Sequence, residues 1–166
     1  MKSLNTNRNK ALTAEWSTPL PLFKLLDNEF HFTLDACAQP FNAKCKKFFS
    51  PKVDGLTKSW NGETVFCCPP SGARNFRLWT KKAFDEAKQG NTTVVMLLPV
   101  STDSKWFWDN IYLQNGVTIR FLKERVKFEN PAVPSWVNGN KSGTQSGMRP
   151  TMVVIFRGDN KPFHCE

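Results

Sequence analysis

One segment of the chain combines residues that could hold an amino group, Cys67-Cys68-Pro69-Pro70-Ser71. It follows a short apolar run, residues 64–66, that is typical of a strand. Because proline lacks an N–H and has a fixed φ, a Pro-Pro pair cannot continue a sheet and forms a rigid, extended turn. The backbone carbonyls of such a turn stay free to accept hydrogen bonds from outside the chain. The segment therefore predicts a site for a ligand that presents an amino group.

Apolar spacing and turn residues predict the helices and strands that must position this turn. Thr18 is expected to cap a helix that begins at Pro19. Helices are predicted over residues 19–28, 75–89 and 103–113, and strands over residues 30–34, 64–68, 92–98, 117–122 and 151–156. Helices that alternate with buried apolar strands are typical of an α/β fold with a mostly parallel sheet flanked by helices.

In sheets of this kind, ligands bind beyond the carboxyl ends of the strands. Three segments follow strand ends, and we expect them to line one cleft: residues 35–38, 68–71 and 99–102. This arrangement would bring an acid, Asp35, and a hydroxyl-rich loop to the Pro-Pro turn.

The length and charge of the chain limit its organisation and its partners. The 166 residues suit one domain, which we expect to span residues 15–158 between a flexible basic tail, 1–14, and a second tail, 159–166. With 23 Lys and Arg against 14 Asp and Glu, the net charge is +9. This excess favours a polyanionic partner such as nucleic acid; a solvated surface that is merely basic is the alternative.

The cysteines show no pattern of a disulfide or metal framework. There are five, two of them adjacent, with no Cys-x-x-Cys spacing and no secretion signal before them. The two histidines, His31 and His164, are far apart in the sequence, so we expect no metal site. No apolar run approaches the roughly 20 residues that a membrane span needs. We therefore expect a cytoplasmic protein without a membrane partner.

Further motifs occur in a fixed order around the Pro-Pro turn. They are Glu15-Trp16-Ser17-Thr18-Pro19, Phe32-Thr33-Leu34-Asp35-Ala36-Cys37-Ala38, Asp54-Gly55-Leu56 with Trp60, Leu97-Leu98-Pro99 and Arg125-Val126-Lys127-Phe128. In order and spacing this set resembles the phage-type, Dam-like DNA N6-adenine methyltransferases, from about Glu15 to Phe156. The resemblance implies a single-domain, reduced class I methyltransferase (Rossmann-like) fold and S-adenosyl-L-methionine as cofactor. It also implies double-stranded DNA of phage or host as partner, in the host cytoplasm if the chain is phage-encoded.

The resemblance also implies which residues meet the cofactor. An acid at the end of the first strand, Asp35, would accept hydrogen bonds from the ammonium group of the cofactor. A buried acid without a partner is costly, which favours ligand contact at this position. The residues expected to contact the cofactor are Trp16, Thr18, Pro19, Asp35, Cys37 and Asp54.

The catalytic turn departs from the family pattern. In the family, an Asn or Asp before Pro-Pro and the carbonyl of the first Pro hold the adenine amine, and an aromatic residue after the turn stacks on the flipped base. The corresponding catalytic residues here are Cys68, Pro69, Pro70 and Ser71. A thiol is a weak acceptor and serine has no π face, so adenine methylation is expected to be slow or absent. Phe76 or Trp79 could supply the missing stacking group if the loop turns inward.

Other interpretations of these cysteines and of the function stay open. Cys67 and Cys68 alternate along a strand, so one is expected to face the core and one the cleft; both could also be small buried apolar residues. Cytosine C5 methylation fits poorly, because its nucleophilic Cys follows a Pro rather than preceding it. The alternative function is a catalytically impaired or inactive methyltransferase-fold protein that binds DNA or a host protein as a regulator or decoy.

Basic residues interleaved with aromatic ones are expected to contact DNA. The candidates are Arg74, Arg77, Lys81, Arg125, Lys127, Trp136, Lys141 and Arg149. Residues 131–150 hold three Pro and three Gly and are predicted to form a long flexible loop. Such a loop is short for a recognition domain, so relaxed sequence specificity is expected. The target sequence and the oligomeric state stay open.

Overall fold

The computed structural model describes residues 16–129, 144–146, 149–159 and 161–166. In these residues a seven-stranded sheet has the order β2-β1-β3-β4-β8-β5-β9. The strands are β1 (Leu34–Asp35), β2 (Lys47–Phe48), β3 (Thr64–Cys67), β4 (Thr93–Pro99), β5 (Val117–Phe121), β8 (Thr151–Phe156) and β9 (His164–Cys165). The predicted α/β class is confirmed.

The half of the sheet that contains β3, the strand before the Pro-Pro turn, is parallel. Strands β2, β1, β3 and β4 all pair in parallel, and β9 pairs in parallel with β5. Strand β8 lies between β4 and β5 and runs antiparallel to both. The carboxyl ends of β1, β3 and β4 therefore meet at one edge of the sheet, as the sequence predicts for a mostly parallel arrangement.

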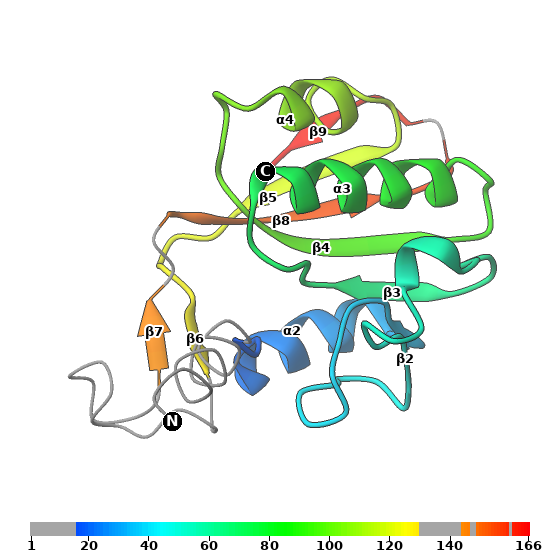
Figure 1. Cartoon of the computed structure of the whole chain (residues 1–166). Helices are drawn as coiled ribbons and strands as arrows, with labels where there is room; N and C mark the ends of the chain where they lie inside the picture. Colours follow the sequence, from blue (N-terminus) through cyan, green and yellow to red (C-terminus); the bar gives the residue numbers. More distant parts are fainter. Residues whose placement is uncertain (1–15, 130–143, 147–148, 160) are drawn as a thin grey trace, which may run out of the picture.

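Helices cover both faces of the sheet (Figure 1). Helices α3 (Ala73–Ala87) and α4 (Lys105–Asn110) lie on one face, and α2 (Leu20–Phe30) lies on the other. Strand β4 contributes to the hydrophobic core on both faces of the sheet, because its alternate side chains point to opposite faces. Val94, Met96 and Leu98 pack towards α3, whereas Val95 and Leu97 pack towards α2. The continuous apolar run of β4 is thus that of a strand buried on both faces.

A small hairpin stands at the edge where β3 and β4 end (Figure 1). It pairs β6 (Lys127–Glu129) with β7 (Thr144–Ser146) in an antiparallel register. Two backbone hydrogen bonds connect this hairpin to the segment before α2. The Ser17 N–H donates to the Glu129 carbonyl at 2.7 Å, and the Ser17 carbonyl accepts from the Glu129 N–H at 2.9 Å. Strand β7 falls inside the loop predicted over 131–150, most of which lies outside the described residues.

The start and end of α2 differ from the sequence prediction. Pro19 takes the N-cap position with an extended ψ of 134°, so the helix begins one residue later and Thr18 does not cap it. The helix continues to Phe30 and ends at His31, whose φ is 56°. The Asp27 carboxylate then accepts the Phe32 N–H at 2.8 Å, which holds the chain in a turn. The strand predicted over 30–34 is consequently reduced to β1.

The chain end and the helix after β4 also differ from the prediction. Residues 159–166 were expected to form a tail, yet β9 pairs with β5 at the edge of the sheet. Helix α4 is shorter than predicted, because the N–H groups of Ile111 and Tyr112 both bond the Phe107 carbonyl and Leu113 turns to a φ of 57°. Apolar residues continue to Leu113, but the changed backbone hydrogen bonding at Ile111 and Tyr112 ends the helix at Asn110.

Candidate active site

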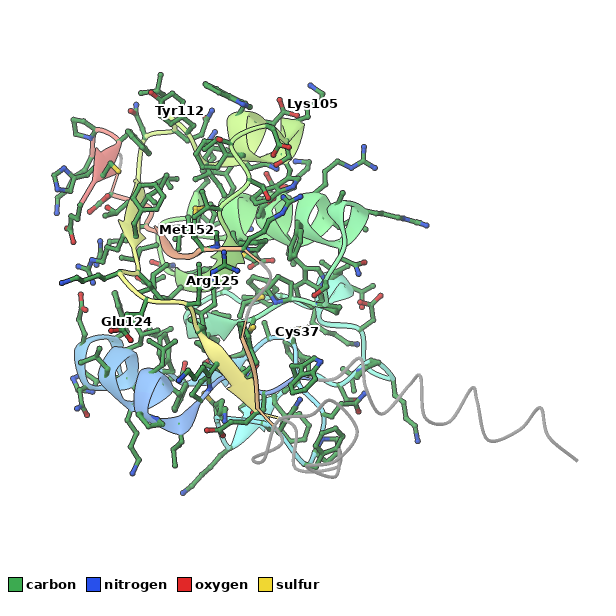
Figure 2. The ribbon with its side chains drawn as sticks, turned by 90° about the vertical axis from the view of Figure 1, so that its left-hand side faces the viewer. Cys37, Lys105, Tyr112, Glu124, Arg125 and Met152 are labelled. Carbon is green, nitrogen blue, oxygen red and sulfur yellow. The ribbon has the colours of Figure 1, made fainter. Side chains whose placement is uncertain are left out.

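The ends of β1 and β3 and the segment before α2 together line a narrow cavity. It measures about 20 Å³, room for about one water molecule. The lining residues are Trp16, Ser17, Thr18, Asp35, Cys37, Ala38, Asn42, Lys44, Phe66 and Cys68. The parallel register of β1 and β3 explains the meeting of the two strand ends, since Asp35 is opposite Phe66 and the Ala36 N–H donates to the Phe66 carbonyl at 2.9 Å. Figure 2 views the molecule from this edge, with Cys37 labelled.

A wider hollow opens beside the cavity. It measures about 270 Å³, close to the lower limit of about 300 Å³ for pockets that bind small molecules. The two spaces share Ser17, Asn42 and Lys44, and the hollow adds exposed apolar walls from Leu20 and Phe41. A polar inner end with an apolar outer wall suits a ligand that has one charged end.

Asp35 is the buried acid of the cavity, with only 2 % of its surface exposed. Its Oδ1 accepts the Cys37 N–H at 3.3 Å and its Oδ2 accepts the Lys44 N–H at 3.0 Å. Burial raises the pKa of Asp35, and these two hydrogen bonds and the Lys44 charge partly offset the increase. Backbone donors fix both oxygens, so the carboxylate is held in place to receive a cation.

Thr18 has a buried hydroxyl that lacks a hydrogen-bond partner among the described residues. Its neighbour in the cavity is the Cys68 thiol, whose pKa it lowers against the larger effect of burial, but a thiol is a weak acceptor and the pair makes no well-formed hydrogen bond. An unpaired buried hydroxyl costs free energy. Because Thr18 lines the cavity, a bound ligand could supply the missing partner.

The two adjacent cysteines face opposite sides of β3. Cys67 is fully buried in the core beneath α3, whereas Cys68 lines the cavity, as alternation along a strand predicts. Burial raises the pKa of the Cys68 thiol to about 11. The thiol therefore stays protonated at neutral pH.

The Pro-Pro turn leaves a backbone carbonyl open. Pro69 is buried, Pro70 and Ser71 are exposed, and no described residue donates a hydrogen bond to the Pro69 carbonyl. The Ser71 carbonyl, in contrast, accepts from the Asn75 side chain at 3.0 Å, which ties the turn to the start of α3. The exposed Ser71 side chain offers no stacking surface.

Neither aromatic residue proposed to replace the stacking group is free to do so. The Trp79 ring is buried and stacks on Trp60 with 6.1 Å between ring centroids. The Phe76 ring packs against Trp106 at 5.5 Å. Trp79 belongs to the core beneath α3 and the half-buried Phe76 packs against that core, so neither ring lines the cavity in this structure.

Of the predicted cofactor contacts, Pro19 and Asp54 do not line the cavity. The carboxylate of Asp54 is exposed and accepts the Leu56 N–H at 3.2 Å, so it caps the short helix η1 (Gly55–Thr57). The third strand end, residues 99–102, does not line the cavity either. Instead its Ser101 hydroxyl accepts a hydrogen bond from Arg149, which fixes that guanidinium beyond the end of β4. The predicted cleft therefore includes two of the three segments.

The basic candidates fall on two surfaces. Arg74, Arg77 and Lys81 are exposed on α3, and Lys81 pairs with Asp85 at 2.7 Å, whereas the two arginines have no carboxylate partner among the described residues. Arg125 is exposed on the segment before the hairpin, where Figure 2 labels it, and Lys127 is exposed on β6 of the hairpin. Trp136 and Lys141 lie outside the described residues.

The described part of the chain contains no group of three His, Cys, Asp or Glu that could hold a metal ion. Its helices include none that is both long and apolar enough to cross a membrane.

Comparison with known proteins identifies the family. The model of the family described as DNA N-6-adenine-methyltransferase (Dam) matches residues 5–165. The chain belongs to the Dam family. A DNA N-6-adenine-methyltransferase of Haemophilus phage HP1 is 31 % identical over 153 residues, which cover 91 % of this chain and 83 % of that protein. One of Escherichia phage T1 is 31 % identical over 104 residues, 61 % of this chain and 42 % of that protein. The predicted family and enzyme class are thus confirmed.

The cavity of this Dam-family chain combines polar groups that could meet a charged ligand end. It contains a fixed acid at Asp35 and an unpartnered hydroxyl at Thr18, and it opens onto a larger hollow. Sequence reasoning missed Asn42 and Lys44, which also line both spaces. They belong to an irregular segment between β1 and β2, where no periodic pattern indicates which side chains turn inward.

Proposed function

We propose that this Dam-family protein transfers a methyl group from S-adenosyl-L-methionine to N6 of adenine in double-stranded DNA, with relaxed sequence specificity. One observation carries the proposal. The buried Asp35 and the residue before Pro69 line the same cavity, at the ends of two adjacent parallel strands. The donor and acceptor subsites would therefore share one edge of the sheet.

The donor subsite would use residues that are already fixed. Asp35 would accept hydrogen bonds from the ammonium group, and Thr18 would gain the partner that its hydroxyl lacks. Trp16 and Cys37 line the same cavity and would enclose that end of the ligand. S-adenosyl-L-methionine held there would supply an electrophilic methyl group in exchange for one N6 proton, which would go to solvent, and would leave as the neutral thioether.

The acceptor subsite would use the backbone of the Pro-Pro turn. The lone pair of the adenine amine is delocalised into the ring, so the amine must be held by acceptors before it can attack. The unpartnered Pro69 carbonyl is suited to accept one N6–H. The base must leave the helix to reach it. The exposed Arg74 and Arg77 beside the turn, with Lys127 and Arg149, would contact the phosphates.

One observation favours a second function. Cys68 takes the position of the side-chain acceptor, and its protonated thiol accepts poorly. Losing that acceptor is expected to cost on the order of 3 kcal/mol, about a hundredfold in rate. A protein with an intact donor subsite and an impaired acceptor subsite could act by binding DNA or a host protein. The phage origin of both relatives suits action in the host cytoplasm.

Two measurements on the same purified protein test the proposal. Calorimetric titration with S-adenosyl-L-methionine comes first, followed by transfer of its tritiated methyl group to unmethylated duplex DNA. Binding with label recovered in N6-methyladenine supports the enzyme. Binding without transfer supports the impaired form. If the cofactor does not bind, the donor subsite is wrongly assigned.

A further inference from the structure

Lys44 lies beside the buried acid of the cavity. Its N–H donates to Asp35 Oδ2 at 3.0 Å, so the backbone fixes the two residues next to each other. Lys44 is half-buried, and it lines both the narrow cavity and the wider hollow. Its ammonium lies within electrostatic range of Asp35 and Cys68, which line the cavity, and of Glu129, which lines the hollow.

The ammonium of Lys44 has no carboxylate partner among the described residues. Lys47 and Lys82, in contrast, each contact a glutamate at 2.5 Å. Three groups lie within electrostatic range of the Lys44 ammonium without forming an ion pair with it: Glu129 on β6, Asp35 on β1 and Cys68 after β3. Burial lowers the pKa of Lys44, because its charged form is partly desolvated. A partly buried cation that is left unpaired favours the binding of an anion.

Asp35 and Lys44 together present opposite charges to one cavity without pairing with each other. Such a pair is complementary to a zwitterion, whose ammonium and carboxylate groups are attached to the same carbon atom. We propose that Lys44 binds the carboxylate of the amino-acid end of the methyl donor, while Asp35 binds its ammonium. This inference rests on the proposed function and assigns a residue to a second group of the same ligand.

The location of Lys44 favours this ligand over a DNA phosphate. The cavity around it is narrow and shared with the buried Thr18 and Asp35. Phosphates of a duplex reach exposed side chains more readily, and Arg74, Arg77 and Lys127 are exposed where Lys44 is half-buried.

The test removes the charge from the protein and the carboxylate from the ligand in turn. Wild type and Lys44→Met are titrated calorimetrically with S-adenosyl-L-methionine and with its decarboxylated analogue, which lacks only the carboxylate. Lys44→Met is expected to weaken binding of the full ligand by about 10–100-fold, the range for a charge-assisted hydrogen bond. It should change binding of the analogue by less than about twofold, because the analogue has no carboxylate to lose.

Two further variants control for indirect effects. Lys44→Arg keeps a cation and should retain most of the affinity for the full ligand. Lys46→Met removes a neighbouring exposed lysine that lines neither space, and should leave both affinities unchanged. Thermal melting of each variant shows whether the fold is intact.

Several results would overturn the inference. Equal weakening of both ligands by Lys44→Met would indicate a structural effect, and no weakening would exclude contact. A variant that keeps its cofactor affinity but binds duplex DNA with a less steep salt dependence would make Lys44 a phosphate contact. In these cases wild type still binds the cofactor, so the proposed function survives. If wild type itself does not bind, both the function and the inference fail.

Discussion

The proposed site has a donor half, around Asp35 and Thr18, and an acceptor half, at the Pro-Pro turn. The two halves differ in the groups that fix their polar atoms. In the donor half, the buried Asp35 carboxylate has each oxygen fixed by a backbone N–H, and the unpartnered Thr18 hydroxyl lies in the same cavity. In the acceptor half, the backbone of the Pro-Pro turn is rigid, but the side chains at its two ends are a protonated thiol and an exposed serine.

In the proposed site, the backbone chemistry of the turn is thus separate from the side-chain chemistry at its two ends. The Pro69 carbonyl is available whatever side chains flank it, because it depends on two proline rings alone. The second acceptor depends on the side chain at position 68, and the stacking group on that at position 71.

The largest effect is expected at the donor half. Asp35→Asn removes the charge that faces the ligand ammonium and should weaken cofactor binding on the order of 100-fold. Calorimetric titration measures the change, and thermal melting reports any loss of the two backbone hydrogen bonds. Asp54→Asn is the matched control, because that carboxylate caps η1 away from the cavity. Comparable losses in both variants would contradict the assignment of Asp35.

The acceptor half should respond in the opposite direction. Cys68→Asn together with Ser71→Tyr restores a side-chain acceptor and a stacking surface beside Pro69. Methyl transfer is expected to rise by about 10–100-fold, while cofactor affinity stays nearly constant. Single-turnover transfer to unmethylated duplex measures the rate. Ser71→Tyr alone should give a smaller gain, and a double variant no faster than wild type would show that the acceptor half lacks more than these two side chains.

The surface beside the turn should show a moderate effect on DNA binding. Arg74→Ala with Arg77→Ala removes two exposed cations that have no described carboxylate partner. If each contacts one phosphate, the slope of log K against log salt should become less steep by about 1.8. Fluorescence anisotropy with labelled duplex at several salt concentrations measures this slope. Lys24→Ala, an exposed cation on α2 at the opposite face, should leave it unchanged.

The smallest expected effect is on stability at alkaline pH. Burial raises the pKa of Cys68 to about 11 and that of Cys45 to about 12, from an ordinary value of 9.0. Between pH 9 and 11 the unfolded chain loses these protons while the folded chain keeps them, so the free energy of unfolding falls as pH rises. Urea denaturation from pH 8 to 11 should show a shallower fall for Cys68→Ala than for wild type. Cys165→Ala, on the exposed β9, is the comparison, and identical slopes for all three proteins would contradict the burial effect.

Much of the fold could be predicted because it depends on local patterns. The apolar run of β4 predicts a strand buried on both faces, and the structure confirms it. The amphipathic spacing after Ser71 predicts α3, with bounds shifted by two residues at each end. Strand β9 and the antiparallel direction of β8 were not predicted, because neither direction nor pairing partner is a property of the local sequence.

The site could be predicted only in part for the same reason. Asp35 and the Pro-Pro turn follow recognisable strands, so their meeting at one edge follows from parallel order alone. Lys44 and Asn42 come from an irregular segment, and only the folded path of that segment brings them to the cavity. Asp54 is predicted to contact the cofactor from its place in a motif, and in the structure its carboxylate accepts the Leu56 N–H at the start of η1.

The sequence by itself determined the α/β class, the family, the rigid Pro-Pro turn and the two divergent residues beside it. These features are set by residue identity and by short-range geometry, which do not depend on the rest of the chain. The tertiary structure alone decided which side chains share the cavity, that the Thr18 hydroxyl lacks a partner, and that Lys44 lies unpaired beside Asp35. Burial and charge proximity arise from segments distant in sequence, and folding fixes them through packing rather than through any local pattern.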